Sequence, residues 1–152
     1  TPVWSGNVAY RTSLFSNGLR FDPRYNRRGH TVGGGSDDVM FQTLLKRRTP
    51  IRYRPDMTIQ HLVDSRRLRR RYFLELHYRS GWKRGRWGES APGRRLCGVP
   101  LFLVRQALGG CLGSVVPFML SREGATRSAM NGAHAVGMAV GCFRGWHSAV
   151  GR

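Results

Sequence analysis

Gly33-Gly34-Gly35-Ser36-Asp37-Asp38 is the stretch around which the rest of the chain is organised. Three glycines form a flexible loop, and two adjacent carboxylates follow it in a chain with only 8 acidic residues against 26 basic ones. The apolar residues after them recur at helical spacing, which predicts a helix from about Asp38 to Arg47 with Ser36 or Asp37 as its N-cap. The positive end of a helix stabilises an ionised carboxylate, which suits a general base or a metal ligand. An ordinary helix cap is the alternative interpretation.

A second segment, Tyr53 to His61, is expected to lie close to the glycine loop. Ile51–Tyr53 and Met57–Ile59 alternate as strands do, and the proline between them restricts such a strand to a sheet edge or a bulge. His61 ends the segment, either as a hydrogen-bonded structural residue or as a metal ligand. Two carboxylates and an imidazole that converge would form a catalytic base beside a metal ion. We therefore expect His61 to lie near Asp37.

The composition limits the size of the protein and the chemistry of its partners. A length of 152 residues is enough for one modest core and excludes a large two-domain enzyme. The net charge of +18 comes almost wholly from arginine, whose guanidinium binds phosphate groups in a bidentate manner. Nucleotides, nucleic acid and acidic lipid headgroups are therefore all candidate partners. The three cysteines lie far apart without CxxC spacing, so no zinc or redox motif is indicated.

An arginine-rich segment follows His61. Asp64 and Ser65 are expected to cap a helix that continues to about Arg79 and carries one apolar stripe among its arginines. Residues 81–95 are glycine-rich and basic with two tryptophans, which predicts a linker with the composition of a membrane interface.

Two apolar segments, Gly98–Leu120 and Ala125–Gly145, predict a helical hairpin at the end of the chain. The first contains a single charge, Arg105; its length would span a bilayer, but the off-centre charge and the glycines fit an interfacial or re-entrant helix equally well. The second has small residues at every fourth place, which favours close contact with the first helix. These small residues are Ala125, Ala129, Ala133, Gly137, Gly141 and Gly145. A soluble hairpin packed on the first part of the chain is the alternative to a membrane-associated one.

Five motifs in order make roughly residues 4 to 85 resemble the second half of a family 2 glycosyltransferase with the GT-A fold. They are Ser5–Arg11, Leu19–Pro23, Ser36–Asp38, Ile51–Asp56 and His61. The resemblance implies an α+β fold: the C-terminal half of a GT-A-like mixed sheet with helices, followed by the apolar helical hairpin. It divides the chain into an acceptor and catalytic half (1–61), a basic helix and linker (62–96) and the hairpin (97–152).

The resemblance also implies roles for individual residues. Asp37 matches the base that deprotonates an acceptor hydroxyl, and Ser36 stands where the family usually has glutamate. His61 matches the histidine near a divalent metal, Mg²⁺ or Mn²⁺. The residues implied on the acceptor side are Gly6, Asn7, Arg11 and Asp38. The reaction implied is inverting transfer of a sugar from a nucleotide-sugar donor to a saccharide, a lipid-linked acceptor or another hydroxyl.

One part of the family pattern has no counterpart in the sequence. The nucleotide-sugar half, which ends in an Asp-x-Asp metal motif, would precede Thr1, and no Asp-x-Asp occurs in these residues. The chain therefore resembles a C-terminal fragment, and we expect it to be inactive alone.

Two other classes of function remain open. A basic nucleic-acid-binding protein would explain the net charge, but no zinc-finger, RNP or helix-turn-helix pattern supports it, and we expect no nucleic-acid partner. A small membrane-associated structural protein would explain the hairpin. The positive-inside bias of the flanking arginines predicts a location at the cell membrane on its cytoplasmic face.

Overall fold

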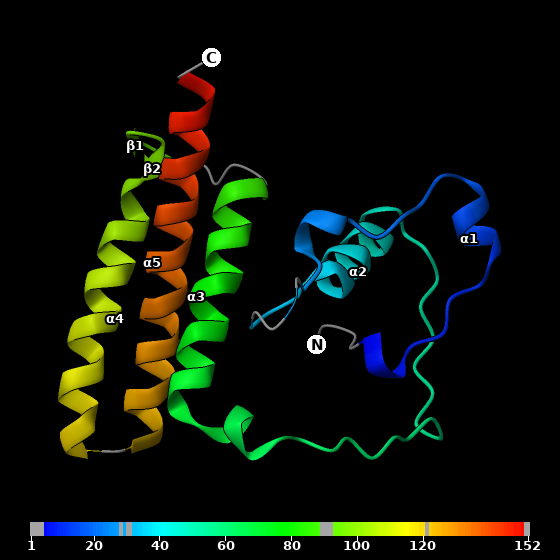
Figure 1. Ribbon diagram of the computed structural model, residues 1–152, viewed down its shortest axis with the longest axis horizontal. Helices are drawn as coiled ribbons and strands as arrows, with labels where there is room; N and C mark the ends of the chain where they lie inside the picture. Colours follow the sequence, from blue (N-terminus) through cyan, green and yellow to red (C-terminus); the bar gives the residue numbers. More distant parts are fainter. Residues whose placement is uncertain (1–4, 28, 30–31, 89–92, 121, 151–152) are drawn as a thin grey trace. The chain divides into compact units, whose positions relative to one another are not determined.

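The described part of the chain is mostly helical and contains one small antiparallel sheet (Figure 1). This computed structural model describes residues 5–27, 29, 32–88, 93–120 and 122–150. The chain forms two compact units. The N-terminal unit comprises Thr1–His30 and Gly34–Val63, and the C-terminal unit comprises Thr31–Gly33 and Asp64–Arg152. The three ranges expected from the resemblance (1–61, 62–96 and 97–152) stay a prediction.

Among the residues that the structure describes, the N-terminal unit contains four short helical elements. They are the 3-10 turns η1 (Ser5–Asn7) and η2 (Pro23–Tyr25) and the α-helices α1 (Ser13–Ser16) and α2 (Ser36–Lys46). Their core consists of a few apolar side chains from α2 and from the chain around α1. The buried ones are Leu19, Met40 and Leu44, and the partly buried ones against them are Tyr10, Leu14 and Phe15.

The start of α2 differs from the prediction. The helix begins at Ser36, two residues earlier than expected, and its N-cap is Gly35 rather than Ser36 or Asp37. Gly35 has a φ of 131°, which glycine adopts without strain, so the glycine loop can turn directly into the helix. Both aspartates consequently lie in the first turn of α2, inside the helix.

The predicted strands at Ile51–Tyr53 and Met57–Ile59 are wrong, because both segments are loop. A turn separates them: the amide of Met57 donates to the carbonyl of Arg54 at 3.2 Å, and Arg54 pairs with Asp56 at 2.6 Å. A strand needs a neighbour that takes up its backbone hydrogen bonds, and no described residue of the N-terminal unit forms one. The GT-A-like mixed sheet stays a prediction.

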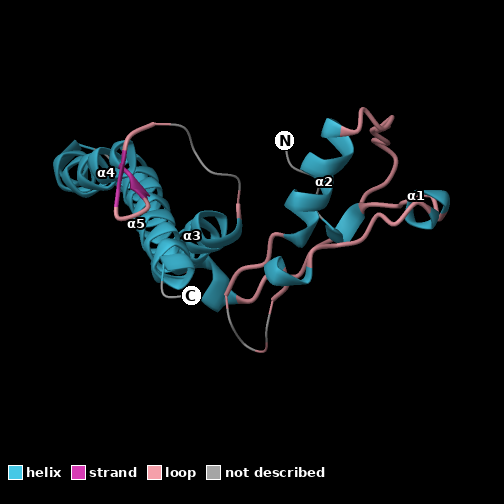
Figure 2. Ribbon diagram, turned by 90° about the horizontal axis from the view of Figure 1, so that it is seen from above, coloured by secondary structure: helices cyan, strands magenta, loops and turns pink. Residues whose placement is uncertain are grey.

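The C-terminal unit is built from three long helices (Figures 1 and 2). A 3-10 turn η3 (Ser65–Leu68) leads into α3 (Arg70–Trp87), and α4 (Leu101–Leu120) and α5 (Arg122–Val150) form the predicted hairpin, which is confirmed. Helix α5 lies between α3 and α4 and packs against both (Figure 1).

The turn η3 before α3 is capped by Asp64, whereas α3 itself has no side-chain cap and ends beyond the predicted residue. The Asp64 carboxylate accepts from the amide of Arg66 at 2.9 Å and pairs with its guanidinium. These bonds hold the pKa of Asp64 down at about 2. The helix itself starts at Arg70 and continues to Trp87, so the linker predicted from Gly81 is wrong over its first seven residues. Glycine is a poor helix former in isolation, and here packing against α5 overrides that propensity.

A small two-stranded sheet closed by a two-residue turn lies directly before α4. Strands β1 (Arg95–Leu96) and β2 (Val99–Pro100) pair antiparallel, with Leu96 opposite Val99. Cys97 and Gly98 between them both have positive φ, 49° and 76°, as a type I′ turn requires.

Glycines bring the backbones of α3 and α5 into direct contact. A Cβ at Gly81 would overlap the carbonyl oxygen of His134, and a Cβ at Gly137 would overlap that of Tyr78. The neighbouring Gly85 behaves in the same way. The expectation that the small residues of α5 face the first hairpin helix is therefore wrong for this part of the stripe, which packs against α3.

The contact between α4 and α5 uses other glycines. A Cβ at Gly110 of α4 would overlap the Cα of Gly132, and the Ser128 hydroxyl lies 3.5 Å from the carbonyl of Gly110. Gly132 lies outside the predicted stripe. Within the residues that the structure describes, no helix combines the length and the apolar character needed to cross a bilayer.

Candidate functional site

The two aspartates of the glycine loop have different environments in the first turn of α2. Asp37 is half-buried, and its Oδ1 accepts from the amide of Asp38 at 3.0 Å, while Asp38 is exposed. A carboxylate at this position lies beside the amides at the positive end of the helix, where its charge interacts favourably with the helix dipole. Asp37 is thus the better placed of the two to act on a ligand from a partly desolvated position.

Tyr10 lies close enough to Asp37 for their charges to interact. Burial raises the pKa of Tyr10, and the negative charge of Asp37 raises this pKa further. The ring is held by edge-to-face contacts with Phe15 and Phe21, at centroid distances of 6.0 and 5.7 Å. The phenol therefore keeps its proton and can donate a hydrogen bond near the carboxylate.

Tyr10 was missed in the sequence analysis. It stands inside the Ser5–Arg11 motif, directly before Arg11, so its proximity to the other candidate residues could have been suspected. What the sequence does not reveal is the aromatic group that turns this ring toward α2.

The structure brings the Gly6–Asn7 motif to the segment that leads to His61. The Asn7 side-chain amide donates to the carbonyl of Met57 at 2.8 Å, across 50 positions of sequence. A Cβ at Gly6 would lie 3.8 Å from the Cδ1 of Ile59, so the Ile59 side chain reaches the backbone at Gly6. Two of the predicted site residues, Gly6 and Asn7, are thereby fixed within a few residues of a third, His61.

Arg11 and His61 are both exposed. The carbonyl of Arg11 accepts from the amide of Leu14 at 3.1 Å, which starts the turn into α1 and leaves the guanidinium at the surface. That His61 lies beside Asp37 stays a prediction.

A divalent metal site does not follow from the described residues. Among them, no three histidine, cysteine or acidic side chains are grouped so that they could hold a metal ion. Mg²⁺ and Mn²⁺ prefer several oxygen ligands, and Asp37, Asp38 and His61 do not form such a set.

Comparisons of the chain with models of protein families, with curated proteins and with solved structures find no match.

Proposed function

We propose that the N-terminal unit is the acceptor side of an inverting, nucleotide-sugar-dependent glycosyltransferase, with Asp37 as the general base. The observation that carries this proposal is the half-buried Asp37 in the first turn of α2 with the protonated Tyr10 beside it. The hydrogen bond from Asn7 to Met57 supports it, because it ties the acceptor motif to the segment of His61.

In the proposed reaction, Asp37 takes the proton of the acceptor hydroxyl. The acceptor oxygen then forms a bond to the anomeric carbon of the donor, and the bond from that carbon to the nucleotide phosphate breaks. The electron pair leaves with the nucleoside diphosphate, and in-line attack inverts the anomeric centre. Proton transfer to a positioned base contributes about 10²–10⁴ to the rate. The Tyr10 hydroxyl can orient the carboxylate or the acceptor by donating a hydrogen bond.

Exposed apolar side chains in the segment around His61 support the proposal that another part of the enzyme covers this segment. Tyr53 is 84% exposed, Ile51 and Ile59 on either side of it in the sequence are also exposed, and Leu62, directly after His61, is 98% exposed. Apolar side chains along an extended segment are typical of a strand that is covered on one face. We assign this cover to a donor-binding half of the enzyme.

The decisive test uses the complete polypeptide that carries this chain together with a donor-binding half. Asp37→Asn should keep nucleotide-sugar binding and lower the transfer rate by about 10²-fold or more, because only the proton acceptor is removed. Asp38→Asn is the matched control and should have a smaller effect. Donor binding is measured by calorimetry and transfer by product formation. Near-normal turnover in Asp37→Asn would refute the assignment.

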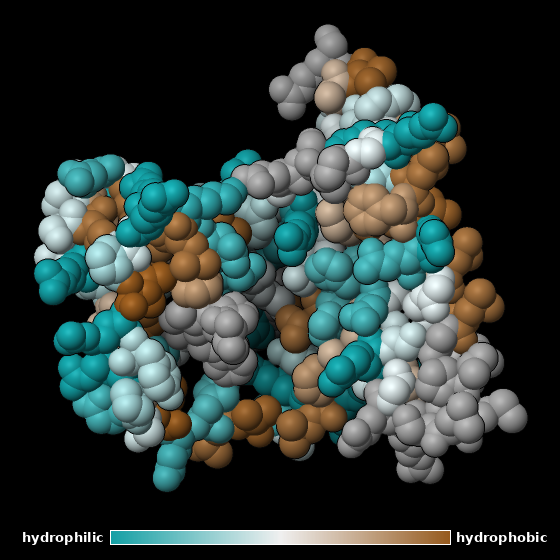
Figure 3. All heavy atoms as spheres, turned by 180° about the vertical axis from the view of Figure 1, so that it is seen from behind, coloured by the Kyte–Doolittle hydropathy of each residue, from teal (hydrophilic) through white to brown (hydrophobic). Residues whose placement is uncertain are grey.

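Membrane association is the second function that a specific observation favours. Apolar side chains of α4 face away from α5, among them Leu108, which is 60% exposed, and Leu112, which is 69% exposed. Together with Leu101 and Val104 they follow one face of the helix at intervals of three or four residues. Figure 3 shows hydrophobic side chains gathered over α4. We infer that this face lies on the cytoplasmic surface of the cell membrane as an interfacial helix.

Vesicle flotation tests this second proposal. Binding through an apolar face persists in high salt, whereas purely electrostatic adhesion is screened. Leu108→Glu should abolish flotation at high salt, and Arg105→Gln on the same helix should not. Release of the unchanged protein by salt alone would contradict the apolar mode.

A further inference from the structure

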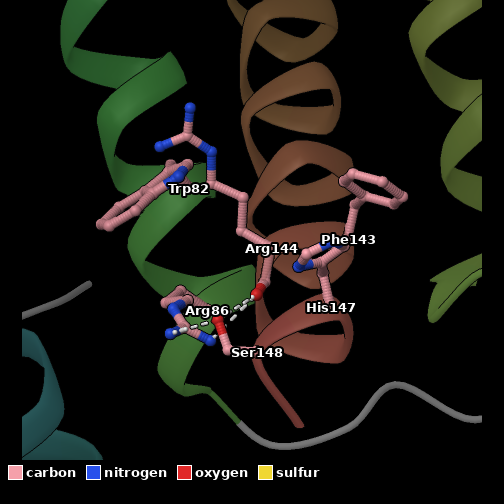
Figure 4. A pocket seen from close by; sticks show the side chains of 6 residues that line it. All are labelled: Trp82, Arg86, Phe143, Arg144, His147 and Ser148. Carbon is pink, nitrogen blue, oxygen red and sulfur yellow. Dashed lines mark hydrogen bonds between the residues drawn. The ribbon is translucent and has the colours of Figure 1, made fainter. Parts of the chain in front are cut away.

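An open pocket of about 500 Å³ lies between α3 and α5 near their C-terminal ends (Figure 4). Its lining combines basic and aromatic side chains and contains no carboxylate. The lining residues are Trp82 and Arg86 of α3 and Phe143, Arg144, His147 and Ser148 of α5.

The glycine contacts of the two helices create this arrangement. A Cβ at Gly141 would overlap the carbonyl oxygen of Trp82 and would lie 2.9 Å from the backbone nitrogen of Arg86. The backbones therefore touch at the pocket, and side chains from both helices must enter the same groove beside the contact. In Figure 4, Arg86 extends from α3 toward α5, while Arg144 extends from α5 toward Trp82.

Arg86 is held in place by α5. Its Nη1 donates to the carbonyl of Arg144 at 3.3 Å, and its Nη2 donates to the Ser148 Oγ at 3.2 Å. Ser148 in turn donates its hydroxyl hydrogen to the same carbonyl at 2.8 Å. A guanidinium has five N–H donors, so these two bonds orient the group and leave donors for a ligand. An ordered side chain of this kind loses little conformational entropy when it binds.

The positive charge of the pocket is not neutralised within the described chain. The ion pairs described in the C-terminal unit join Arg66 to Asp64 and Arg79 to Glu75, and neither involves Arg86 or Arg144. Two guanidinium groups on facing helices repel each other, and an anion bound between them removes that repulsion. Guanidinium groups match the oxygens of a phosphate in bidentate geometry.

We propose that this pocket binds the phosphate group of an organic phosphate. Arg86 and Arg144 hold the phosphate oxygens, His147 adds a further hydrogen-bonding group, and Trp82 and Phe143 contact the carbon part of the ligand. The same chemistry is presented by a soluble organic phosphate and by the headgroup of an anionic phospholipid. This site lies within the C-terminal unit and does not depend on the proposed transferase function.

The test compares Arg144→Gln with Arg127→Gln in the full 152-residue chain. Both residues are exposed on α5 and both changes remove one positive charge, but only Arg144 lines the pocket. No described hydrogen bond uses the Arg144 guanidinium, so Arg144→Gln should fold normally, and circular dichroism checks this. Inorganic pyrophosphate, titrated by calorimetry, probes the soluble source. Flotation with phosphatidylcholine vesicles, with and without phosphatidic acid, probes the lipid source.

We expect Arg144→Gln to weaken binding about tenfold or more and Arg127→Gln to change it less than about twofold. Arg144→Lys, which keeps the charge and loses the planar fork, should be intermediate. Saturable binding of pyrophosphate with this pattern identifies a soluble phosphate, and the pattern with phosphatidic acid vesicles alone identifies a headgroup. Equal losses in the two glutamine variants, or no binding of either probe, would overturn the proposal.

Discussion

In the N-terminal unit the chain packs around three buried side chains, whereas in the C-terminal unit two helices pack backbone against backbone. The first arrangement depends on side-chain volume, since Leu19, Met40 and Leu44 are nearly all of its core. The second depends on the absence of side chains, since Gly81 and Gly137 allow α3 and α5 to touch. Removing side-chain volume should therefore destabilise the N-terminal unit, and adding a methyl group at a glycine contact should destabilise the C-terminal unit.

Removing volume from the N-terminal unit should have the largest effect. Met40 is 2% exposed, so Met40→Ala should destabilise this unit by about 2–5 kcal/mol through lost burial and the cavity left behind. Native-state hydrogen exchange should then show faster exchange for the amides of α2 and unchanged exchange for those of α5. Leu45→Ala, on the exposed side of the same helix, should have little effect. A simultaneous loss of protection in α5 would show that the units do not open separately.

Adding a methyl group to the C-terminal unit should have a somewhat smaller effect. Gly137→Ala forces α5 away from the carbonyl of Tyr78 and should cost about 3 kcal/mol, as overpacking typically does. Gly109→Ala is the matched control, because nothing lies within 4 Å of its Cβ position in α4. That change should stabilise the protein by about 0.5–1 kcal/mol through helix propensity. Urea unfolding followed by circular dichroism measures both values, and equal effects would contradict the backbone-contact interpretation.

Acidification should produce the smallest effect, and it should act on the C-terminal unit. Burial between α3 and α5 lowers the pKa of His134, and the charge of Arg84 lowers it further. The unfolded chain therefore takes up the proton first as the pH falls below about 6.5, so stability is complete above that value and decreases below it. The midpoint temperature of thermal unfolding should therefore decrease when the pH is lowered from about 7 to about 5. His134→Gln should reduce this fall, and an unchanged fall in this variant would contradict the assignment to His134.

The two regions also differ in how well their sequences predict them. The hairpin of α4 and α5 could be predicted because a long apolar run and a regular small-residue pattern are properties of the local sequence. The partner of Gly137 and Gly141 could not, because the matching glycines of α3 lie in a segment whose composition indicates a linker. Helix α3 extends through Gly81 and Gly85 only because tertiary contact compensates for their weak helix propensity.

The candidate site could be predicted only in part from the sequence. The position of Asp37 and Asp38 at the start of a helix follows from the glycine loop and the apolar spacing after it. The N-cap was misassigned because Gly35 adopts a backbone conformation that the pattern of polar caps does not include. The strands predicted before His61 do not form. An alternating pattern of apolar and polar residues shows only that a segment can pair, and pairing needs a neighbouring strand. The proximity of Tyr10 to Asp37 depends on aromatic packing that no local pattern encodes.

The glycines of α3 that touch α5, Gly81 and Gly85, are only two in number, and this limits how the two helices can be aligned. Sliding α3 along α5 by four residues, about 6 Å, so that Gly81 took the place of Gly85, would bring His77 to the place of Gly81. The side chain of His77 would then meet the carbonyl oxygen of His134, which a Cβ alone already overlaps. The same shift would remove Ser148 from the reach of Arg86. The glycine pair therefore sets the register of α3 on α5, and Ser148→Ala should leave that register unchanged.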